Sequence, residues 1–541
     1  MVELHVPRFA VLTPVHGADQ ECLAACLASV GDQSFDDWEH VLVDDGSTDP
    51  ATSELVATAS AADPRVRWIH QPVGAGEAAA NRAALAAAVG ELIVMLDHRE
   101  LLHVDALAEM NAAFADPGVD VAYSDHDVVD ADGFVTESAF KPDFAPEWLR
   151  AHDYVTPLVA ARRNLADSVG AFDDRYTGAL DHDFALRLTE RARRVAHVRR
   201  ALCHVRTPVP ESPPTAPAAE GGVRAVADHC ARVGIDVSVE ATINEGCYRL
   251  VRRVADRPLV SVVIPTRGAT GRVWGATRCY VVEAVRSLAE HSTYRQLEFV
   301  VVYDADTPEP VLSALDRVPD AVINLVPYRA PFNFSAKINL GVAHASGDLV
   351  LLLNDDTELI EPASVEVLVG HLQTPGVAAA GAKLLFADGT LQHGGVVNSI
   401  EPDHACLGWR GDSAGPRPLR PLAVERECSA VTAACALVDR AAFDEVGGFA
   451  TELPLNYNDV DFCLKLRAAG HRIVWSPWAV LFHFESRSRL SRVLPEELAW
   501  LDDRWHAELT ADPYYNPNLV PGRHDFLEMP TPFGLPRRAV W

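Results

Sequence analysis

Two short acidic clusters, each following an apolar run, could carry chemistry in this chain. The first lies in "LIVMLDHRELL" at 92–102 and the second in "VLLLNDDTELI" at 350–360. Clustered carboxylate and amide oxygens hold hard divalent cations such as Mg²⁺ or Mn²⁺, usually together with substrate phosphates. Arg99 stands in the first cluster where Asp356 stands in the second, and its charge would repel a divalent cation. We therefore expect the metal site in the second half and an altered one in the first.

Both clusters belong to the same alternation of strands and helices. In the first half the pattern predicts strands at 8–15, 40–47 and 91–96 and helices at 21–30, 52–62 and 77–89. In the second half it predicts strands at 259–266, 298–307 and 348–353 and helices at 281–291 and 335–345. Strands that alternate with helices are typical of parallel sheets, so the predicted fold class is α/β with two mostly parallel central sheets.

The intervals between polar residues at the predicted strand ends indicate a duplication. Asp44 to Asp97 spans 53 residues and Asp304 to Asn354 spans 50, while Asp181 to His204 spans 23 and Asp459 to His483 spans 24. Ligands of open α/β sheets bind at the carboxyl ends of the strands, where these acidic residues are expected to lie. A single Asp or Asn could equally form a turn or cap a helix, but the repeated set favours a binding site.

Composition and missing motifs disfavour several other classes of protein. The net charge of −29 argues against nucleic-acid binding and against broad adhesion to anionic lipid. No apolar run approaches the ~20 residues that span a bilayer, no signal peptide is recognised, and the ten cysteines form no C-x-x-C pair, so we expect a reduced cytoplasmic location. The sequence has no G-x-x-x-x-G-K-[ST] loop and no G-x-G-x-x-G after the first strand of either half. P-loop ATPases and nicotinamide dehydrogenases are therefore disfavoured.

Longer stretches of the chain resemble a known family. They are residues 331–360, 381–397, 427–449, 458–477 and 481–489 in the second half, and 43–50, 123–130, 140–149 and 180–191 in the first. In this order they resemble family 2 glycosyltransferases with the GT-A fold. More narrowly, they resemble tandem-domain bacterial enzymes of O-antigen and cell-surface polysaccharide assembly, often rhamnosyltransferases. The resemblance implies an inverting transfer in which a carboxylate takes the acceptor's proton and a divalent cation, Mn²⁺ or Mg²⁺, steadies the departing nucleoside diphosphate.

The resemblance also implies roles for residues of the second half. Asp459, at the start of a predicted helix, would be the catalytic base, and Asp461 is a weaker candidate that could orient its neighbours. The metal would be held by Asn354, Asp356 and His483. The nucleotide would be bound by Pro265, Thr266, Arg267, Asp304, Lys337, Asn339 and Asp355. Structural roles stay open, such as a helix-capping role for Asp459 and a solvated surface charge for Lys337.

In the first half the corresponding residues are changed. The counterparts are predicted to be Pro14, Asp44, Asp97, Arg99, Asp181 and His204. The family shows Asp-His-Asp-Asp where this chain reads Asp97-His98-Arg99-Glu100. One interpretation, which we favour, is a first domain that is inactive or much slowed and serves acceptor binding or support. The other is that the planar guanidinium of Arg99 itself neutralises a diphosphate.

We predict four segments and one main function. The segments are a first GT-A-like domain at 1–206, a Pro-rich linker with a short helix and strand at 207–257, a catalytic GT-A domain at 258–492, and a helical and aromatic tail at 493–541 that packs on the second domain. The function is transfer of a sugar from a nucleotide-sugar donor to a growing cell-surface polysaccharide or lipid-linked glycan, with peripheral attachment to the inner face of the membrane left open. Two alternatives are an enzyme with both domains active, and a non-catalytic nucleotide-sugar-binding scaffold of a polysaccharide assembly complex.

Overall fold

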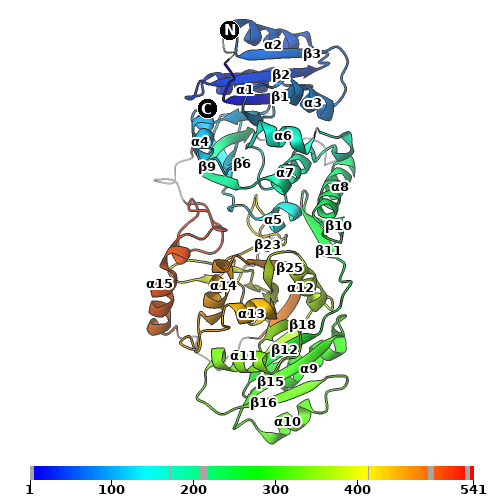
Figure 1. Cartoon of the computed structure of the whole chain (residues 1–541), viewed down its shortest axis with the longest axis vertical. Coiled ribbons are helices and arrows are strands. Elements are labelled where there is room, and N and C mark those ends of the chain that lie inside the picture. The colour runs from blue at the N-terminus through cyan, green and yellow to red at the C-terminus, as the bar shows by residue number, and fades with distance from the viewer. Residues whose placement is uncertain (1–4, 171, 207–215, 412, 485–492, 530–536) are drawn as a thin grey trace.

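The computed structural model describes residues 5–170, 172–206, 216–411, 413–484, 493–529 and 537–541. These residues form two α/β halves that lie end to end, the first blue to cyan and the second green to orange in Figure 1. A nine-stranded sheet lies in the first half and a ten-stranded sheet in the second. Within the described residues, no helix has both the length and the apolar character needed to cross a membrane.

The first sheet has the strand order β3-β2-β1-β4-β8-β6-β9-β5, with β7 paired to β6. Its strands are β1 (Phe9–Val15), β2 (Trp38–Asp45), β3 (Val66–Gln71), β4 (Leu92–Met95), β5 (Glu100–Leu102), β6 (Val121–Val129), β7 (Val135–Ala139), β8 (Val159–Arg162) and β9 (Val195–Arg206). β1 to β4 run parallel, and β8 joins them to the parallel pair β6–β9 by antiparallel contacts. The helices are α1 (Gln20–Gly31), α2 (Pro50–Ala62), α3 (Glu77–Ala87), α4 (Ala106–Ala113), α5 (Pro146–Ala151), α6 (Arg163–Val169) and α7 (Leu180–Arg191).

The second sheet has the order β16-β15-β12-β17-β24-β19-β25-β18, with β20 paired to β19 and β23 to β25. Its strands are β12 (Val260–Thr266), β15 (Leu297–Asp304), β16 (Ile323–Tyr328), β17 (Leu349–Leu353), β18 (Thr357–Leu359), β19 (Val377–Leu385), β20 (Leu391–His393), β23 (Arg426–Glu427), β24 (Cys435–Asp439) and β25 (Arg472–His483). Two small hairpins accompany it, β13 (Thr270–Val273) with β14 (Ala276–Cys279), and β21 (Val396–Val397) with β22 (Asp403–His404). The helices are α9 (Tyr280–His291), α10 (Glu309–Leu315), α11 (Phe334–Ala343), α12 (Ser364–Leu372), α13 (Arg440–Glu445), α14 (Asn458–Ala468) and α15 (Pro495–Thr510).

Strand for strand, the two sheet orders are the same, which confirms the predicted α/β fold built twice. The central strands β1 and β12 are buried along almost their whole length, as continuous apolar runs require. The parallel edge strands β3 and β16 were not predicted. Each is only half-buried and interrupts its apolar residues with polar ones, so neither shows the continuous run by which the neighbouring strands were recognised.

A connecting region lies between the two halves. It comprises α8 (Ala216–Arg232) and the hairpin of β10 (Val237–Ala241) and β11 (Tyr248–Arg252). Residues 207–215, the centre of the predicted Pro-rich linker, lie outside the described residues. Val226 and Cys230 of α8 and Tyr248 and Leu250 of β11 join the hydrophobic core of the first half. The connecting region therefore packs as part of that half.

Buried ion pairs join the halves. Arg252 of β11 lies 2.6 Å from a carboxylate oxygen of Glu147 on α5 and 2.6 Å from one of Glu425 in the second half. Arg472 of β25 lies 3.1 Å from Glu147 and 2.9 Å from Glu427. The three glutamates are almost completely buried. Breaking such an interface would leave uncompensated charges in a low-dielectric environment, so the ion pairs favour a fixed arrangement of the halves.

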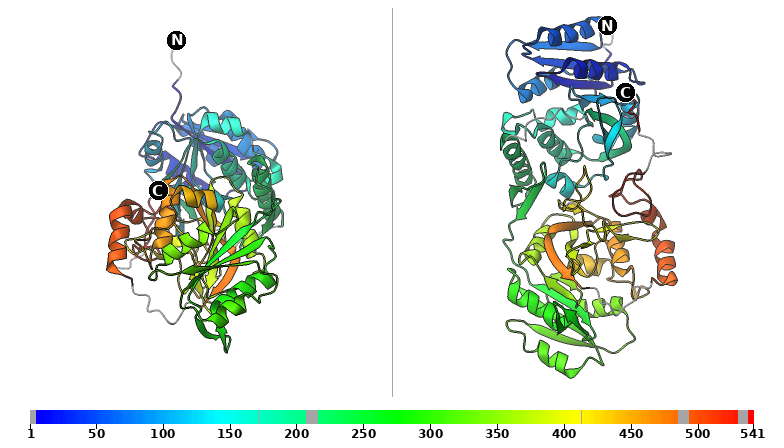
Figure 2. Two further views of the ribbon diagram at one scale, coloured as in Figure 1. Left: turned by 60° about the horizontal axis from the view of Figure 1, so that its bottom comes forward. Right: turned by 180° about the vertical axis from the view of Figure 1, so that it is seen from behind.

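The segment that follows β25 contacts both halves. Leu501, Trp505 and Leu509 of α15 pack in the core of the second half. Beyond α15 the described residues reach the first half, where the amide nitrogen of Asn516 donates to both carboxylate oxygens of Asp125 at 3.1 and 3.0 Å. Figures 1 and 2 show the C-terminus beside the first half. The prediction that the whole tail packs on the second domain is therefore wrong for its last part.

Candidate active site

The predicted metal ligands of the second half lie together at the ends of two strands. Asn354 and Asp356 follow β17, and β18 pairs Thr357 with His483 at the end of β25. His483 Nε2 lies 3.1 Å from Asp356 Oδ1 and 3.2 Å from Asn354 Nδ2, and an amide flip would present the Asn354 oxygen instead. His483 Nδ1 lies 2.8 Å from the oxygen of Gln392, which fixes the ring. A carboxylate, an amide and an imidazole at these distances fit a divalent cation.

The predicted base is held in the first turn of α14. Asp459 accepts a hydrogen bond from the backbone N–H of Ala433 at 3.1 Å. Two residues before Asp459, Tyr457 has a φ of 56°, which is uncommon for a residue other than glycine. The buried carboxylate of Glu497 on α15 accepts the backbone N–H of Asn456 at 3.0 Å and its side-chain amide at 2.6 Å. The tail helix therefore holds the turn that presents Asp459.

Three of the residues predicted to bind the nucleotide, Thr266, Asp304 and Asp355, lie at the ends of β12, β15 and β17. Thr266 donates through its hydroxyl to Asp355 at 2.6 Å. Lys337 is buried, donates to the carbonyl of Thr266 at 2.8 Å and lies 2.8 Å from Asp304. This arrangement excludes the solvated surface charge that was left open for Lys337, and it holds Asp304 at the strand end.

Three further predicted nucleotide residues have different environments. Pro265 is buried within β12, and Arg267 is exposed just after it. Asn339 donates to the carbonyl of Phe449 at 2.8 Å and accepts its N–H at 2.9 Å. Both ends of the Asn339 amide are therefore engaged by backbone, so this residue braces α11 and does not face a diphosphate.

The side chain of Asp461 contacts the tail helix α15. Its Oδ1 accepts a hydrogen bond from the indole of Trp505 at 2.9 Å, and its Oδ2 lies 3.4 Å from Lys465. The carboxylate is completely buried. Its predicted catalytic role is not supported by these contacts, because Asp461 attaches α15 to α14.

One cavity joins the metal cluster and the base. Its volume is about 1430 Å³, and its lining includes Asn354, Asp459, His483 and Gln392. Sequence reasoning did not assign Gln392 or Glu497 a role. Gln392 lies inside the stretch 381–397 that carried the family resemblance, so its position offered a signal. The sequence around Glu497 offered no such signal, because Glu497 meets Asn456 only in the folded chain.

In the first half Arg99 occupies the place of Asp356. Strand registers align residues 97–99 with residues 354–356. Arg99 Nε donates to Asp97 Oδ1 at 2.9 Å, and a second guanidinium nitrogen lies 3.3 Å from Oδ2. Burial opposes ionisation of Asp97, but the hydrogen bonds and charge of Arg99 outweigh it and lower the pKa of this carboxyl. An internal cation thus neutralises the surviving carboxylate.

Two of the predicted first-half counterparts are wrong by one residue. β5 pairs Glu100, at the position of Thr357, with Val205, so Val205 and not His204 corresponds to His483. His204 lies on the other face of β9, where its Nε2 is 3.3 Å from the carbonyl of Val540.

The second error concerns the first-half counterpart of Asp304, the acid predicted to bind the base or ribose of the nucleotide. Registers of the β1–β2 and β12–β15 pairs make Asp45, and not Asp44, the counterpart of Asp304. Asp44 accepts the N–H of Ser47 at 3.0 Å and the hydroxyl of Ser53 at 2.9 Å. It therefore closes the turn between β2 and α2. Pro14 matches Pro265 in the same registers.

The base position is retained in the first half. Asp181 lies in the first turn of α7, as Asp459 does in α14. Its side chain reaches solvent, yet the surrounding protein desolvates the carboxyl. Together with the charges of Glu77, Asp153 and Asp97, this raises the pKa of Asp181 to about 7. The first half therefore keeps a carboxyl in the base position but lacks the histidine and carboxylate of the metal cluster.

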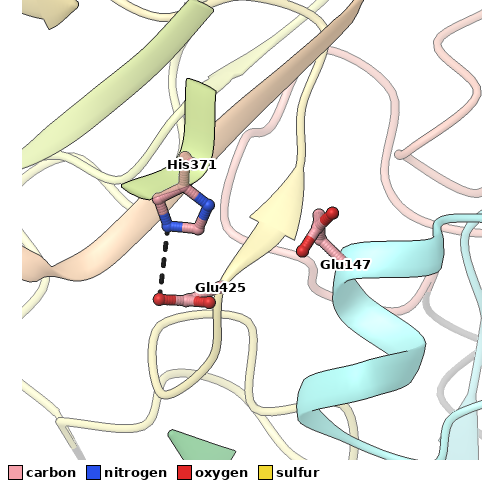
Figure 3. A group of neighbouring side chains, drawn as sticks. All are labelled: Glu147, His371 and Glu425. Carbon is pink, nitrogen blue, oxygen red and sulfur yellow. Dashed lines mark ion pairs between the residues drawn. The ribbon is translucent and has the colours of Figure 1, made fainter. Parts of the chain in front are cut away.

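A separate buried group could geometrically hold a metal ion. Glu147, His371 and Glu425 lie at the interface of the halves, and Figure 3 shows the pair between His371 and Glu425. Arg252 already lies 2.6 Å from both glutamates, and Arg472 lies 3.1 Å from Glu147. Adding a divalent cation beside these guanidinium groups would be unfavourable. We interpret the group as part of the ion pairs that join the halves.

Comparison with known families identifies the fold of both halves. Residues 10–167 match the family described as "Glycosyl transferase family 2", and residues 257–503 match the one described as "Glycosyltransferase like family 2". The chain belongs to glycosyltransferase family 2. The two matched regions contain the two sheets of the same strand order.

Two relatives of this family 2 chain match almost its whole length. An uncharacterized protein of Sinorhizobium fredii, y4gI, is 36% identical over 545 residues, which cover 96% of this chain and 58% of the relative. The O-antigen biosynthesis protein RfbC of Myxococcus xanthus is 33% identical over 526 residues, which cover 95% of this chain and 40% of the relative. The chain thus spans about half the length of these curated relatives.

Two solved structures show a weaker likeness. TarS of S. aureus (residues 1–349) matches with a TM-score of 0.32 and 18% identity, covering 37% of this chain and 60% of that one. The mannosyltransferase PcManGT of Pyrobaculum calidifontis, in complex with GDP-Man and Mn²⁺, matches with a TM-score of 0.31 and 19% identity, covering 43% and 59%. The site is therefore assigned from the geometry of this chain.

Proposed function

We propose that this chain is an inverting glycosyltransferase that moves a sugar from a nucleotide-sugar donor to a hydroxyl of a growing cell-surface glycan, with its chemistry in the second half. One observation carries the proposal: Asn354, His483 and Asp459 line the same cavity. Metal ligands and a base must both lie beside the anomeric carbon for a single displacement. A non-catalytic scaffold would not need a carboxylate at that place.

In this proposal Asp459 takes the proton of the acceptor hydroxyl. Its bond to the N–H of Ala433 fixes the orientation of its carboxylate, and a positioned base contributes about 10²–10⁴-fold to the rate. Asp356, His483 and Asn354 would hold a divalent cation, Mn²⁺ or Mg²⁺, which neutralises charge on the leaving diphosphate.

The donor's nucleotide is proposed to lie at the ends of β12, β15 and β17. Thr266 orients Asp355 toward the ribose, and buried Lys337 holds Asp304 for the base or ribose. Without Lys337 the Asp304 carboxylate would lose its paired cation and its fixed place. Arg267 is exposed beside these residues and is suited to contact the diphosphate.

The biological setting is proposed from the relatives and the resemblance. The printed name of the Myxococcus xanthus relative concerns O-antigen biosynthesis, which favours a polysaccharide or lipid-linked glycan as acceptor. A cytoplasmic location and peripheral attachment to the membrane stay predictions.

The decisive experiment is a donor screen. The purified chain would be incubated with UDP-, GDP-, dTDP- and CMP-linked sugars in Mn²⁺, Mg²⁺ or chelator, and release of free nucleotide would be measured. We expect metal-dependent release from one donor, lost in Asp459→Asn and Asp356→Ala. Turnover that both variants retain in full would refute the assignment of the site, and no turnover of any donor would refute the activity.

A further inference from the structure

The cavity extends far beyond the metal cluster. Its lining includes segments 396–404 and 509–512, residues of 515–524, and Arg199 of the first half. Its volume of about 1430 Å³ exceeds the roughly 300–1,000 Å³ of a pocket for one small ligand. It therefore has room for more than the transferred sugar.

The cavity does not reach the residues proposed to bind the nucleotide. Thr266, Asp304, Lys337 and Asp355 are all described by the structure, and none of the four is among its lining residues. The lining includes Asp459, whose carboxylate must face the incoming hydroxyl under the proposed function. This placement assigns the cavity to the acceptor.

The outer wall of the cavity is built jointly by the tail and the first half. Asn518 of the tail donates to the carbonyl of Arg199 at 3.1 Å. Further along, the carbonyl of His524 accepts the N–H of Cys406 at 2.8 Å, and the ring nitrogen of His524 lies 3.3 Å from the hydroxyl of Ser399. The tail thus spans from β9 of the first half to the loop between β21 and β23, and Figure 2 shows it between the halves.

The charges in the lining favour a neutral ligand. Both lining arginines already have carboxylate partners, Arg199 with Asp143 and Arg523 with Asp525. The lining carboxylates include Glu401, Asp403, Asp459 and Asp512. A phosphate would meet these carboxylates without a surplus of cations, whereas uncharged hydroxyl groups can bond to both kinds of side chain.

Apolar side chains complete a surface suited to sugar rings. Ile400, Leu407 and Val493 line the cavity and are 60%, 49% and 43% exposed. Exposed large apolar side chains gathered in one recess indicate a binding surface. The apolar faces of pyranose rings can pack on such residues while their hydroxyl groups reach the polar lining.

We propose that this cavity binds the non-reducing end of an uncharged glycan over more than one sugar, and that Arg199 and the tail form its outer wall. The inference rests on the proposed function and gives the first half a part in it: the first half contributes to acceptor binding whether or not it turns over a donor of its own. Arg199 would donate hydrogen bonds to acceptor hydroxyls, and Ile400 would pack against a ring.

The test uses the full chain with Arg199→Ala and Ile400→Asp. Arg200→Ala is the matched control, because Arg200 adjoins Arg199 in β9 but pairs with Glu109 and does not line the cavity. Donor hydrolysis without acceptor, transfer to fluorescent neutral gluco-, galacto-, manno- and rhamno-oligosaccharides, and binding of the same oligosaccharides by saturation-transfer NMR would be measured. We expect the acceptor KM to rise about ten-fold in both variants. Arg199→Ala removes one charged hydrogen bond to the acceptor, and Ile400→Asp places a charge against a sugar ring. The rate of donor hydrolysis should change less than the acceptor KM. Arg200→Ala should match the wild type.

The outcomes separate this inference from the proposed function. Donor hydrolysis by the wild type together with unchanged acceptor KM in both variants would overturn the inference alone. So would the absence of oligosaccharide binding, or stronger competition by polyprenyl phosphate than by any oligosaccharide. If the wild type hydrolyses no nucleotide sugar, the proposed function fails and the inference fails with it.

Discussion

At the end of β17 the second half brings Asp356 and His483 within 3.1 Å of each other, whereas at the end of β4 the first half pairs Arg99 with Asp97. Both clusters sit on sheets with the same strand order. The position of His483 is taken by Val205 in the first half. The scaffold therefore does not depend on the metal cluster, because an internal ion pair can replace the cluster without changing the sheet around it.

A second difference concerns the helix before each cluster. The buried positions of α3 and α11 follow the same pattern, which aligns Ala80 with Lys337. The first half thus lacks the lysine that holds Asp304, and its Asp45 instead accepts backbone N–H groups of residues 75 and 76 at 2.7 and 2.9 Å. The first half thus differs from the second both in the metal cluster and in the group that holds the acid at the end of β2 or β15.

The largest expected difference between the two halves comes from replacing the carboxylate in the base position of each half in turn. Asp459→Asn should lower the rate of transfer by about 10²–10⁴-fold, because the acceptor hydroxyl loses its proton acceptor. Asp181→Asn should leave transfer nearly unchanged if the first half has lost its activity. The measurement is kcat for sugar transfer with the donor found in the screen.

The same pair of variants tests the bifunctional alternative. If Asp181→Asn and Asp459→Asn each give a different truncated product, both halves are active and the contrast drawn between their sites does not hold. The raised pKa of Asp181, about 7, is the observation that makes this alternative worth testing.

The next largest effect is on the free energy of unfolding, and it comes from breaking the buried ion pairs between the two halves. Arg252→Met leaves Glu147 and Glu425 without one of their partners, and breaking a buried ion pair in this way costs about 3–5 kcal/mol. Arg253→Met is the matched control: Arg253 is exposed, lies 3.7 Å from Asp236, and an exposed pair contributes about 0–1 kcal/mol. Urea unfolding, followed by tryptophan fluorescence, measures the free energy of unfolding of both variants. Equal effects of the two variants would show that the halves are not coupled through these charges.

Much of this contrast was visible in the sequence, and the errors have identifiable causes. Periodicity located β1, β2, β4 and their helices, and the change to Arg99 was read directly. Asp44 was chosen over its neighbour Asp45, and only the registers of the pairs β1–β2 and β12–β15 distinguish the two. His204 was chosen by residue type, although Val205 is the residue that lies 24 positions after Asp181, the same interval that separates His483 from Asp459. A slip of one residue moves a side chain to the opposite face of a strand. The roles of Asn339 and Asp461 failed because their partners are more than 40 residues distant in the chain.

A smaller effect should follow from loosening the support of His483. Gln392→Ala removes the oxygen that lies 2.8 Å from His483 Nδ1, and loss of such a partner costs about 10–100-fold in metal affinity. Ser138→Ala, on β7 at the corresponding edge of the first sheet, should not change the metal requirement. The concentration of Mn²⁺ that gives half-maximal nucleotide release is the readout. An unaltered requirement in Gln392→Ala would count against His483 as a ligand.

The smallest effect is on the pH dependence of stability, and it depends on Glu100, which stands where the second half has Thr357. Burial, with the charge of Asp97, raises the pKa of Glu100 to about 8 from an ordinary value of 4.5. The folded chain therefore keeps a proton that the unfolded chain releases above pH 4.5, so this contribution to stability is complete below 4.5 and is lost as the pH rises through 8. Glu100→Thr should flatten the fall of the melting temperature between pH 5 and 9, and the variant should gain most at pH 9. If the wild type and Glu100→Thr lose melting temperature in parallel across this range, Glu100 ionises in the folded chain as an exposed glutamate does, and the assignment is wrong.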